Sequence, residues 1–170
     1  MFNSPITCYN SPIGKLKIVS NQRAIVSLRF VDDDTLEEFL TKWSPILAKC
    51  LNQLDEYFRG ERKTFTVSIS YKGTPFQKTV WKELTNIPFG QTCTYKDIAI
   101  KLGNCNASRI IGRVNSNNPI MIIVPCHRVI GVNNKLRGYT GGIWRKKWLL
   151  DHEKQYHESS LSSLPKFFQN

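Results

Sequence analysis

The spacing of apolar residues changes near Lys72 and Gly73, and this change limits the possible folds more than any other feature of the sequence. Before it, apolar and polar residues alternate around 16–19, 25–30 and 65–71, as in strands that bury one face. After it, apolar residues recur every three or four positions, which predicts helices. We therefore expect an α+β fold: a small N-terminal α/β domain with a few-stranded sheet, then a mainly helical C-terminal domain.

The predicted N-terminal domain covers residues 1–72 and contains two helices as well as strands. Apolar residues between 36 and 43 share one helical face, which stops before Pro45. A second apolar face extends over 47–58, and Gly60 follows it as a helix terminator. Strands that precede helices in so short a segment favour a small α+β unit.

The predicted C-terminal domain covers residues 73–157, and residues 158–170 are expected to form a loose tail. Thr74 is expected to cap a helix whose first residue is a proline. Thr94 is expected to cap the next helix, because Asp97 stands three residues later and completes a capping pattern.

Two short helices joined by residues 103–105 have the spacing of a helix-turn-helix. Gly103 ends the first, and Asn106 is placed to cap the second. The residues of the second helix expected to face inward are Ile110, Ile111 and Val114. Any helical hairpin produces this pattern, so a DNA-binding and a purely structural interpretation both stay open.

The apolar run at 120–124 predicts a buried strand, which Asn117, Asn118 and a proline separate from the preceding helix. A Gly- and Asn-rich loop then extends to Gly142, and the last helix is expected over 144–156.

The net charge of +11 is unevenly distributed along the chain. Residues 1–72 carry ten basic against eight acidic side chains, a net +2, whereas residues 73–170 carry fourteen against five, a net +9. This asymmetry indicates a polyanionic partner for the second half, with nucleic acid as the first candidate. Simple solubility explains the charge equally well.

The five cysteines are scattered and form no C-x-x-C pair, and all three histidines stand in the C-terminal half. We therefore expect no disulfide framework and no metal site. The expected location is a reducing compartment: the cytoplasm, or the nucleus if the source is a eukaryote. No apolar segment approaches the length of a membrane span and the N-terminus does not resemble a signal peptide, so no membrane partner is expected.

Cys126 directly follows the apolar run and Pro125, which places it at the rim of the core. The neighbouring His127 and Arg128 are cationic surroundings of the kind that favour a thiolate. A small buried hydrophobe is the commonest fate of a free cysteine, and the residues alone leave the two interpretations comparable.

Consecutive side chains diverge, so His127 is not expected to point straight at the Cys126 sulfur. A bridging water can relay the proton, with a carboxylate on the other ring nitrogen, and Glu153 is the candidate. Cysteine peptidases use a histidine far along the chain, so the adjacent pair argues against one.

The segment over residues 118–131, NPIMIIVPCHRVIG, resembles the signature of the O6-alkylguanine-DNA alkyltransferases. The agreement continues at 94–99, 138–142 and 148–153, and covers about residues 54–154. A chance match of four ordered blocks is very improbable.

The resemblance implies irreversible, single-turnover transfer of the methyl or other alkyl group from O6-alkylguanine, and from O4-alkylthymine, to Cys126, with no cofactor. It also implies a monomer that binds double-stranded DNA through the minor groove and flips the damaged base into its pocket. The implied catalytic residues are Cys126, His127, Glu153 and Tyr95, and Tyr95 would donate a hydrogen bond to the leaving guanine.

The resemblance further implies DNA contacts and a base pocket. The DNA contacts are Thr94, Ser108, Arg109, Arg113 and Arg128, and Arg109 would fill the space that the flipped base leaves. The pocket residues are Asn118, Val129, Tyr139 and Thr140, together with the Cys126 carbonyl. Taken singly, Tyr95 is equally a half-buried amphipathic residue, Arg109 a solvated helix charge and Asn118 a turn residue.

The sequence departs from the family pattern at several positions. Met121 replaces a proline, which predicts a more pliable pocket edge, and Ile110, Arg113 and Val114 are bulkier than the small residues of many relatives, which puts the depth of docking in doubt. Non-catalytic relatives carry tryptophan at the cysteine position, whereas Cys126 is intact. The remaining rivals are a non-enzymatic lesion-binding protein, a cysteine hydrolase and a sequence-specific helix-turn-helix regulator.

Overall fold

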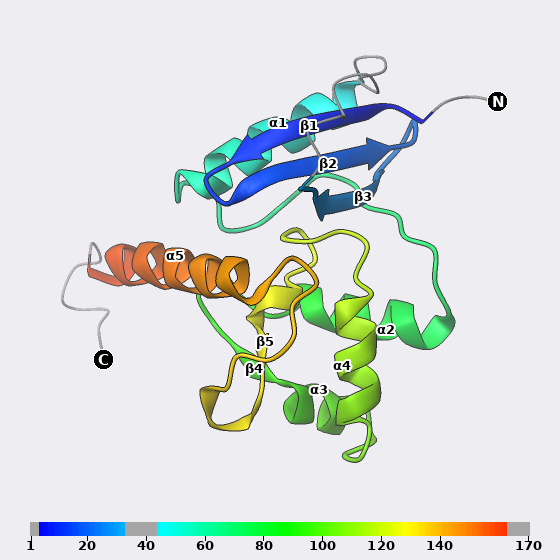
Figure 1. Ribbon diagram of the computed structural model, residues 1–170, viewed down its shortest axis with the longest axis vertical. Coiled ribbons are helices and arrows are strands. Elements are labelled where there is room, and N and C mark those ends of the chain that lie inside the picture. Colours follow the sequence, from blue (N-terminus) through cyan, green and yellow to red (C-terminus); the bar gives the residue numbers. More distant parts are fainter. Residues whose placement is uncertain (1–3, 33–43, 163–170) are drawn as a thin grey trace.

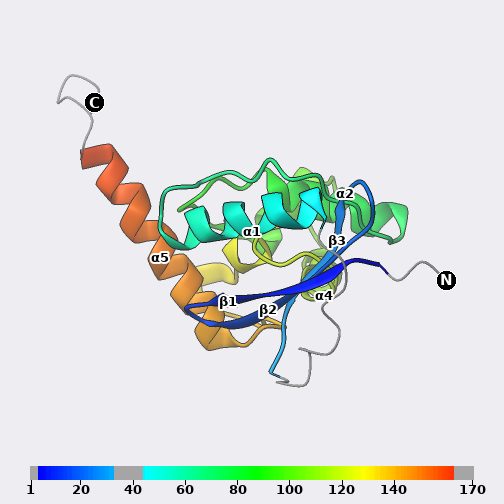
Figure 2. The same ribbon diagram turned by 90° about the horizontal axis from the view of Figure 1, so that it is seen from above.

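The computed structural model describes residues 4–32 and 44–162. Its N-terminal part is a three-stranded antiparallel sheet in the order β1-β2-β3, with one helix packed on it. Figure 2 shows α1 lying across one face of the sheet. The elements are β1 (Ile6–Ser11), β2 (Gly14–Ser20), β3 (Ile25–Phe30) and α1 (Pro45–Phe58).

The alternation over β2 is confirmed, because Leu16, Ile18 and Ser20 are buried and their neighbours less so. In β3 the buried residues Ile25 and Leu28 are three apart, because the register with β2 shifts between Val19 and Ser20. The strand β1 was not predicted. The expected helix over 36–43 lies outside the described residues.

The strand expected over 65–71 is wrong: the structure has only an isolated bridge in this segment. Burial alternates along this segment as predicted, but a single parallel bridge joins Ile69 to Ile25. The backbone of Ile25 bonds Ser68 and Ser70, and the rest of the segment stays extended beside the sheet without a ladder. Side-chain alternation reports which face is buried and does not require a pairing partner along the whole strand.

The C-terminal part is mainly helical, which confirms the α+β class. Its elements are α2 (Pro75–Thr85), β4 (Cys93–Thr94), α3 (Tyr95–Lys101), α4 (Ser108–Ser116), the 3-10 turn η2 (Cys126–Arg128), β5 (Val129–Ile130), the turn η3 (Val132–Asn134) and α5 (Ile143–Ser162). Both predicted N-caps are confirmed: Thr94 forms the expected capping box with Asp97 at the start of α3, and Thr74, predicted only as a cap, also forms a capping box with Gln77 at the start of α2. Gly103 follows α3 with a φ of 78°, as a helix terminator should.

Two predictions for α4 are wrong. The N-cap is Ala107 rather than Asn106, because the backbone of Ala107 bonds Asn104 and this turn delays the helix. Ile111 and Val114 are buried as expected, but Ile110 is 57 % exposed. A helix this short packs one narrow stripe, and Ile110 lies beside that stripe.

The segment 120–124 is a buried turn, not the expected strand. Ile122 has a φ of 70°, and the Val124 N–H bonds the Ile120 carbonyl. Leu28 of β3 bridges Ile120, so the run enters the core at its first residue and then reverses. An apolar run records burial and does not distinguish a strand from a compact buried turn.

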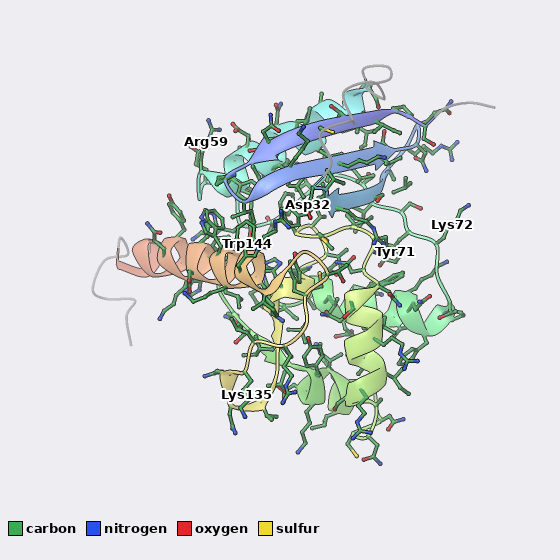
Figure 3. All side chains as sticks on the ribbon, viewed as in Figure 1. Asp32, Arg59, Tyr71, Lys72, Lys135 and Trp144 are labelled. Carbon is green, nitrogen blue, oxygen red and sulfur yellow. The ribbon has the colours of Figure 1, made fainter. Side chains whose placement is uncertain are left out.

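The two parts share one continuous core. Arg145 of α5 joins them directly: its guanidinium donates to the Ile13 carbonyl at 2.8 Å and pairs with Asp32 at 2.9 Å. Figure 3 shows Asp32 and Trp144 at this junction, and Tyr71 and Lys72 on the segment that leads to α2.

The helix α5 extends to Ser162, beyond the end predicted for it and into the expected tail. Figure 1 shows it lying below the sheet and beside the helical part. Among the described residues, no helix is both long enough and apolar enough to cross a membrane.

Candidate active site

Cys126 is the first residue of η2, directly after the buried turn, and its side chain is buried. Asn118 holds both the turn and the sulfur: its Nδ2 donates to the Val124 carbonyl at 2.8 Å and lies 3.0 Å from the Cys126 Sγ. Its Oδ1 accepts from the Ile120 N–H at 3.0 Å. One amide thus shapes the turn and presents a donor to the thiol.

The surroundings of the sulfur differ from the cationic ones expected. Burial raises the pKa of Cys126, and the Asn118 donor and the Lys146 charge oppose that rise. Burial also lowers the pKa of His127. The buried pair is therefore a thiol beside a neutral imidazole, and the thiolate has to be produced by proton transfer.

His127 and Glu153 form a buried pair, as expected, with the His127 Nε2 2.8 Å from the Glu153 Oε1. A carboxylate can only accept, so this contact places the imidazole proton on Nε2. The Nδ1 is buried and has no hydrogen-bond partner among the described residues. Its lone pair is consequently available as a base.

Glu153 is the centre of a wider network. Arg128 donates to both of its oxygens, from Nε at 2.8 Å and from Nη2 at 2.9 Å, and the Gly90 N–H donates at 3.1 Å. Tyr57 of α1 donates its hydroxyl at 2.7 Å. Burial alone raises the pKa of Glu153, but His127 and Arg128 outweigh it and hold the pKa well below its usual range.

This network corrects the DNA contact expected of Arg128. The side chain is 6 % exposed, pairs with Glu153, and donates from Nη1 to the Ile87 carbonyl. A guanidinium needs several acceptors when it is buried, and these two residues supply them. Arg128 therefore lies inside the protein and does not face DNA.

Lys146 is a site residue that was not predicted. It is fully buried, and its Nζ donates to the Val129 carbonyl at 2.6 Å and to the Arg137 carbonyl at 3.0 Å. Burial lowers its pKa to about 8, with Cys126 acting in the opposite direction. The signal was its spacing from Leu149 and Glu153, at three and seven residues along one helical face.

Tyr139 and Thr140 come from the loop before α5. Tyr139 is buried, its hydroxyl has no hydrogen-bond partner of normal geometry among the described residues, and besides burial the nearby Cys126 raises its pKa. Thr140 donates its hydroxyl to the Ser116 carbonyl at 2.6 Å, which ties the loop to α4. The loop thus forms a wall beside the thiol.

A cleft of about 630 Å³ opens between α3, α4 and this loop. Three predicted site residues meet there: Tyr95, Ser108 and Arg109. Its other lining residues are Lys96, Gly112, Ser116, Gly131, Val132, Arg137 and Gly138. Cys126 is not part of the lining, but it lies close enough to the lining residue Tyr95 to raise, together with burial, the pKa of that hydroxyl.

The remaining predicted residues lie outside this cleft. Arg113 is exposed on α4, Val129 is buried, and the Thr94 hydroxyl is occupied by its capping bonds. Met121 is 3 % exposed and belongs to the core, and the more pliable pocket edge expected from it stays a prediction.

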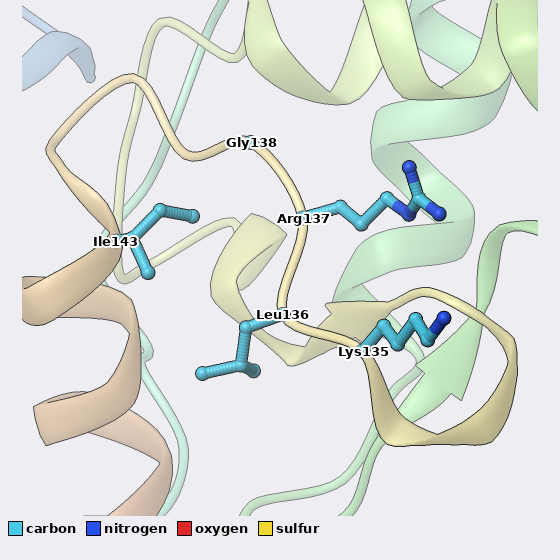
Figure 4. A pocket seen from close by; sticks show the side chains of 5 residues that line it. All are labelled: Lys135, Leu136, Arg137, Gly138 and Ile143. Carbon is cyan, nitrogen blue, oxygen red and sulfur yellow. The ribbon is translucent and has the colours of Figure 1, made fainter.

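A second depression of about 500 Å³ lies beside the same loop. Figure 4 shows Leu136 and Ile143 on one side of the loop, and the cationic ends of Lys135 and Arg137 on the other. Arg137 borders both hollows. The loop therefore places one cationic side chain, Arg137, at the main cleft. Among the described residues, no group of three or more metal-ligating side chains could hold a metal ion.

Comparisons with known proteins agree on one family. Residues 6–71 match the model for the ribonuclease-like domain of 6-O-methylguanine DNA methyltransferase, and residues 75–155 match the model for its DNA binding domain. The chain is 43 % identical over 156 residues to a methylated-DNA--protein-cysteine methyltransferase of Mycobacterium bovis, with 90 % of this chain and 94 % of that protein covered. It is 42 % identical over 148 residues to the protein of the same name from Methanosarcina acetivorans, at 85 % and 95 % coverage.

Solved structures give the same result. The crystal structure of the Mycobacterium tuberculosis O6-methylguanine methyltransferase superposes with a TM-score of 0.80 at 40 % identity, covering 89 % of this chain and 93 % of the other. A structure of the Mycobacterium tuberculosis protein in complex with DNA has a TM-score of 0.78 at 42 % identity, with 88 % and 92 % covered. The resemblance of the four sequence blocks is confirmed, and the chain belongs to the 6-O-methylguanine DNA methyltransferase family.

Proposed function

We propose that this protein repairs alkylated DNA by direct reversal, moving the alkyl group of O6-alkylguanine, and of O4-alkylthymine, onto Cys126. The observation that carries the proposal is a buried thiol with an Asn118 donor 3.0 Å from its sulfur, directly followed by the buried His127–Glu153 pair. A bond forms between Sγ and the alkyl carbon while the bond from that carbon to O6 breaks, and the electron pair leaves with the guanine. The product is a thioether, so each molecule reacts once.

The thiol proton leaves through His127. Its Nδ1 has a free lone pair, and a water between Nδ1 and Sγ relays the proton, while Glu153 stabilises the imidazolium that results. The Asn118 donor and the Lys146 charge stabilise the thiolate as it forms. Burial keeps the sulfur protonated until a substrate arrives.

The base occupies the cleft above Cys126. Tyr95 borders the cleft, and its hydroxyl donates to the departing guanine, which makes guanine a better leaving group. The base edge is read by the Thr140 N–H and by the carbonyls of Cys126 and Val129. The Val129 carbonyl accepts from Lys146 and keeps a second lone pair for the base, whereas the Cys126 carbonyl already accepts from Asn115 at 3.2 Å and from the Val129 N–H and would have to exchange one of these bonds. Tyr139 forms one wall.

The protein acts on DNA as a monomer from the minor groove, with α4 inserted and the damaged nucleotide rotated into the cleft. Arg109 is exposed at the cleft and fills the stack that the base leaves. Ser108, Arg113 and Thr94 contact the backbone around it. Ile110 follows Arg109 on α4 and is exposed, and its side chain contacts the deoxyribose edges of the minor groove.

Residues 1–72 and 73–157 are proposed as two domains on a shared core. The location is a reducing compartment, because the reaction needs a free thiol and the five cysteines are unpaired.

The test is the mass of the intact protein after incubation with an O6-methylguanine oligonucleotide. The wild-type protein should gain one methyl group, and Cys126→Ser should gain none while retaining DNA affinity within about twofold, since one sulfur adds little contact area. Cys105→Ser, at an exposed cysteine in the helix-turn-helix, is the matched control and should react like wild type. DNA binding without any mass gain would identify a lesion-binding protein, and mass gain by Cys126→Ser would assign another acceptor.

A further inference from the structure

Tyr57 connects the N-terminal part of the protein to the reaction centre. It stands on α1, which packs on the sheet, whereas Glu153 stands on α5, 96 residues later. The two side chains meet through a hydrogen bond of 2.7 Å from the Tyr57 hydroxyl to the Glu153 Oε1. Figures 1 and 2 show these two helices as separate layers, with α1 on the sheet and α5 beside the helical part.

Packing fixes the position of this hydroxyl. The Tyr57 ring is fully buried and has four aromatic neighbours at centroid distances of 5.3–6.0 Å, which are Phe58, Phe65, Phe89 and His152. Its backbone carbonyl accepts from the His152 Nε2 at 2.9 Å, so α1 and α5 are bonded on both sides of the ring. Rotation of the hydroxyl away from Glu153 would leave it buried without a partner, which is costly.

Three donors share the Glu153 Oε1. Tyr57 approaches at 2.7 Å, His127 at 2.8 Å and Arg128 at 2.9 Å. Donors to the same oxygen draw on the same negative charge, so a stronger bond from one weakens what the oxygen offers the others. Tyr57 is neutral, unlike Arg128, so it binds the Glu153 Oε1 without adding a positive charge beside His127.

We propose that Tyr57 is a positioning residue for the transfer reaction, which sets the orientation and basicity of His127 through the Oε1 of Glu153. This proposal rests on the proposed proton relay. It makes the N-terminal part a contributor to the chemistry, although none of the residues described there, 4–32 and 44–72, borders the cleft.

The direction of the effect follows from the groups that face the pair. Burial lowers the pKa of His127, Glu153 raises it, and Arg128 and Lys146 lower it further. Tyr57 holds part of the Oε1 charge, so its removal leaves more charge for His127 and stabilises the imidazolium. The pKa of His127 then rises, and protonation disables the base at a higher pH than in wild type.

The experiment measures single-turnover transfer rate against pH, with O6-methylguanine in duplex DNA. In Tyr57→Phe the acid limb should move up by about 0.5 to 1 pH unit, the scale of losing one bond to a charged group. In Glu153→Gln it should move down and the plateau rate should fall, because the charge that supports the imidazolium is gone. The control is Tyr9→Phe, whose hydroxyl contacts Asp55 at 3.4 Å and whose ring stacks on Phe58 in the same aromatic group.

The outcomes separate the two proposals. A wild-type profile in Tyr57→Phe together with a shifted one in Glu153→Gln overturns the role of Tyr57 and leaves the relay intact. Unchanged profiles in both overturn the relay itself. If Tyr57→Phe does not fold, 3-fluorotyrosine at position 57 keeps the ring and supplies a stronger donor. The acid limb should then move to lower pH, and its failure to do so overturns the proposal.

Discussion

Two arginines that were both expected to meet DNA ended in opposite environments. Arg128 is buried and bonded to Glu153 and to a backbone carbonyl, whereas Arg109 is exposed on α4 at the cleft. The same contrast holds for their surroundings: the reaction centre is closed and its polar groups are mostly paired, while the outer face of α4 carries exposed Ile110 and Arg113. A reactive thiol needs groups held in place before the substrate arrives, and a DNA-binding face needs side chains still available for it.

The largest difference between the buried reaction centre and the exposed face of α4 should appear in the free energy of unfolding. Glu153→Ala leaves Arg128 buried without its carboxylate, and His127 and Tyr57 lose their acceptor, so unfolding should become easier by about 3–5 kcal/mol. Arg109→Ala should change stability by less than about 0.5 kcal/mol, as expected of an exposed site. Urea denaturation of both variants measures this, and equal losses would remove the contrast.

His127 and Glu153, as parts of one proton relay, should show coupled effects when they are substituted. His127→Ala should slow transfer and raise the apparent pKa of Cys126 further above that of a free thiol, since its proton acceptor is gone while burial remains. Glu153→Gln should slow transfer by the same route, and the double variant should be little worse than the worse single one. Rates against pH for the three variants decide it, and cleanly additive effects contradict the relay.

Arg109 should affect the repair rate only with duplex DNA, in which a flipped base leaves a gap between stacked bases. Arg109→Ala should slow repair of duplex DNA about tenfold or more, because a flipped base leaves a gap that costs a few kcal/mol, and should leave reaction with free O6-methylguanine base unchanged. Arg113→Ala is the matched variant on the same helix and should affect binding more than rate. An equal loss on both substrates would exclude stack filling.

The smallest effect concerns the exposed charges. Affinity for undamaged DNA should fall as salt rises, with a log–log slope of about −0.9 per phosphate contact, and Arg113→Ala should reduce the slope by about one contact. Arg29→Ala, at an exposed position on β3, should leave the slope unchanged. A flat salt profile in the wild-type protein would contradict the interpretation of the net +9 in residues 73–170.

The features that the sequence predicted correctly are those that short segments decide. The N-cap at Thr74 and the capping box at Thr94 each depend on a few neighbouring residues, and the alternation in β2 follows from which face is buried. The family came from ordered blocks around Cys126, and the His127–Glu153 pair followed from it together with the need for a carboxylate.

The errors and omissions share a physical cause, which is that contacts between distant parts of the chain decided them. The run at 120–124 turns because it meets Leu28, and Arg128 points inward because Glu153 stands 25 residues later. Tyr57 is separated from that carboxylate by 96 residues, and no local pattern predicts such a pairing. The sequence determined the helices α1, α2, α3 and α5 and the strand β2, and it singled out Cys126 as the candidate alkyl acceptor. Only the tertiary structure decided where each buried charge finds its partner, because a charge removed from water must be satisfied by whatever the fold brings beside it.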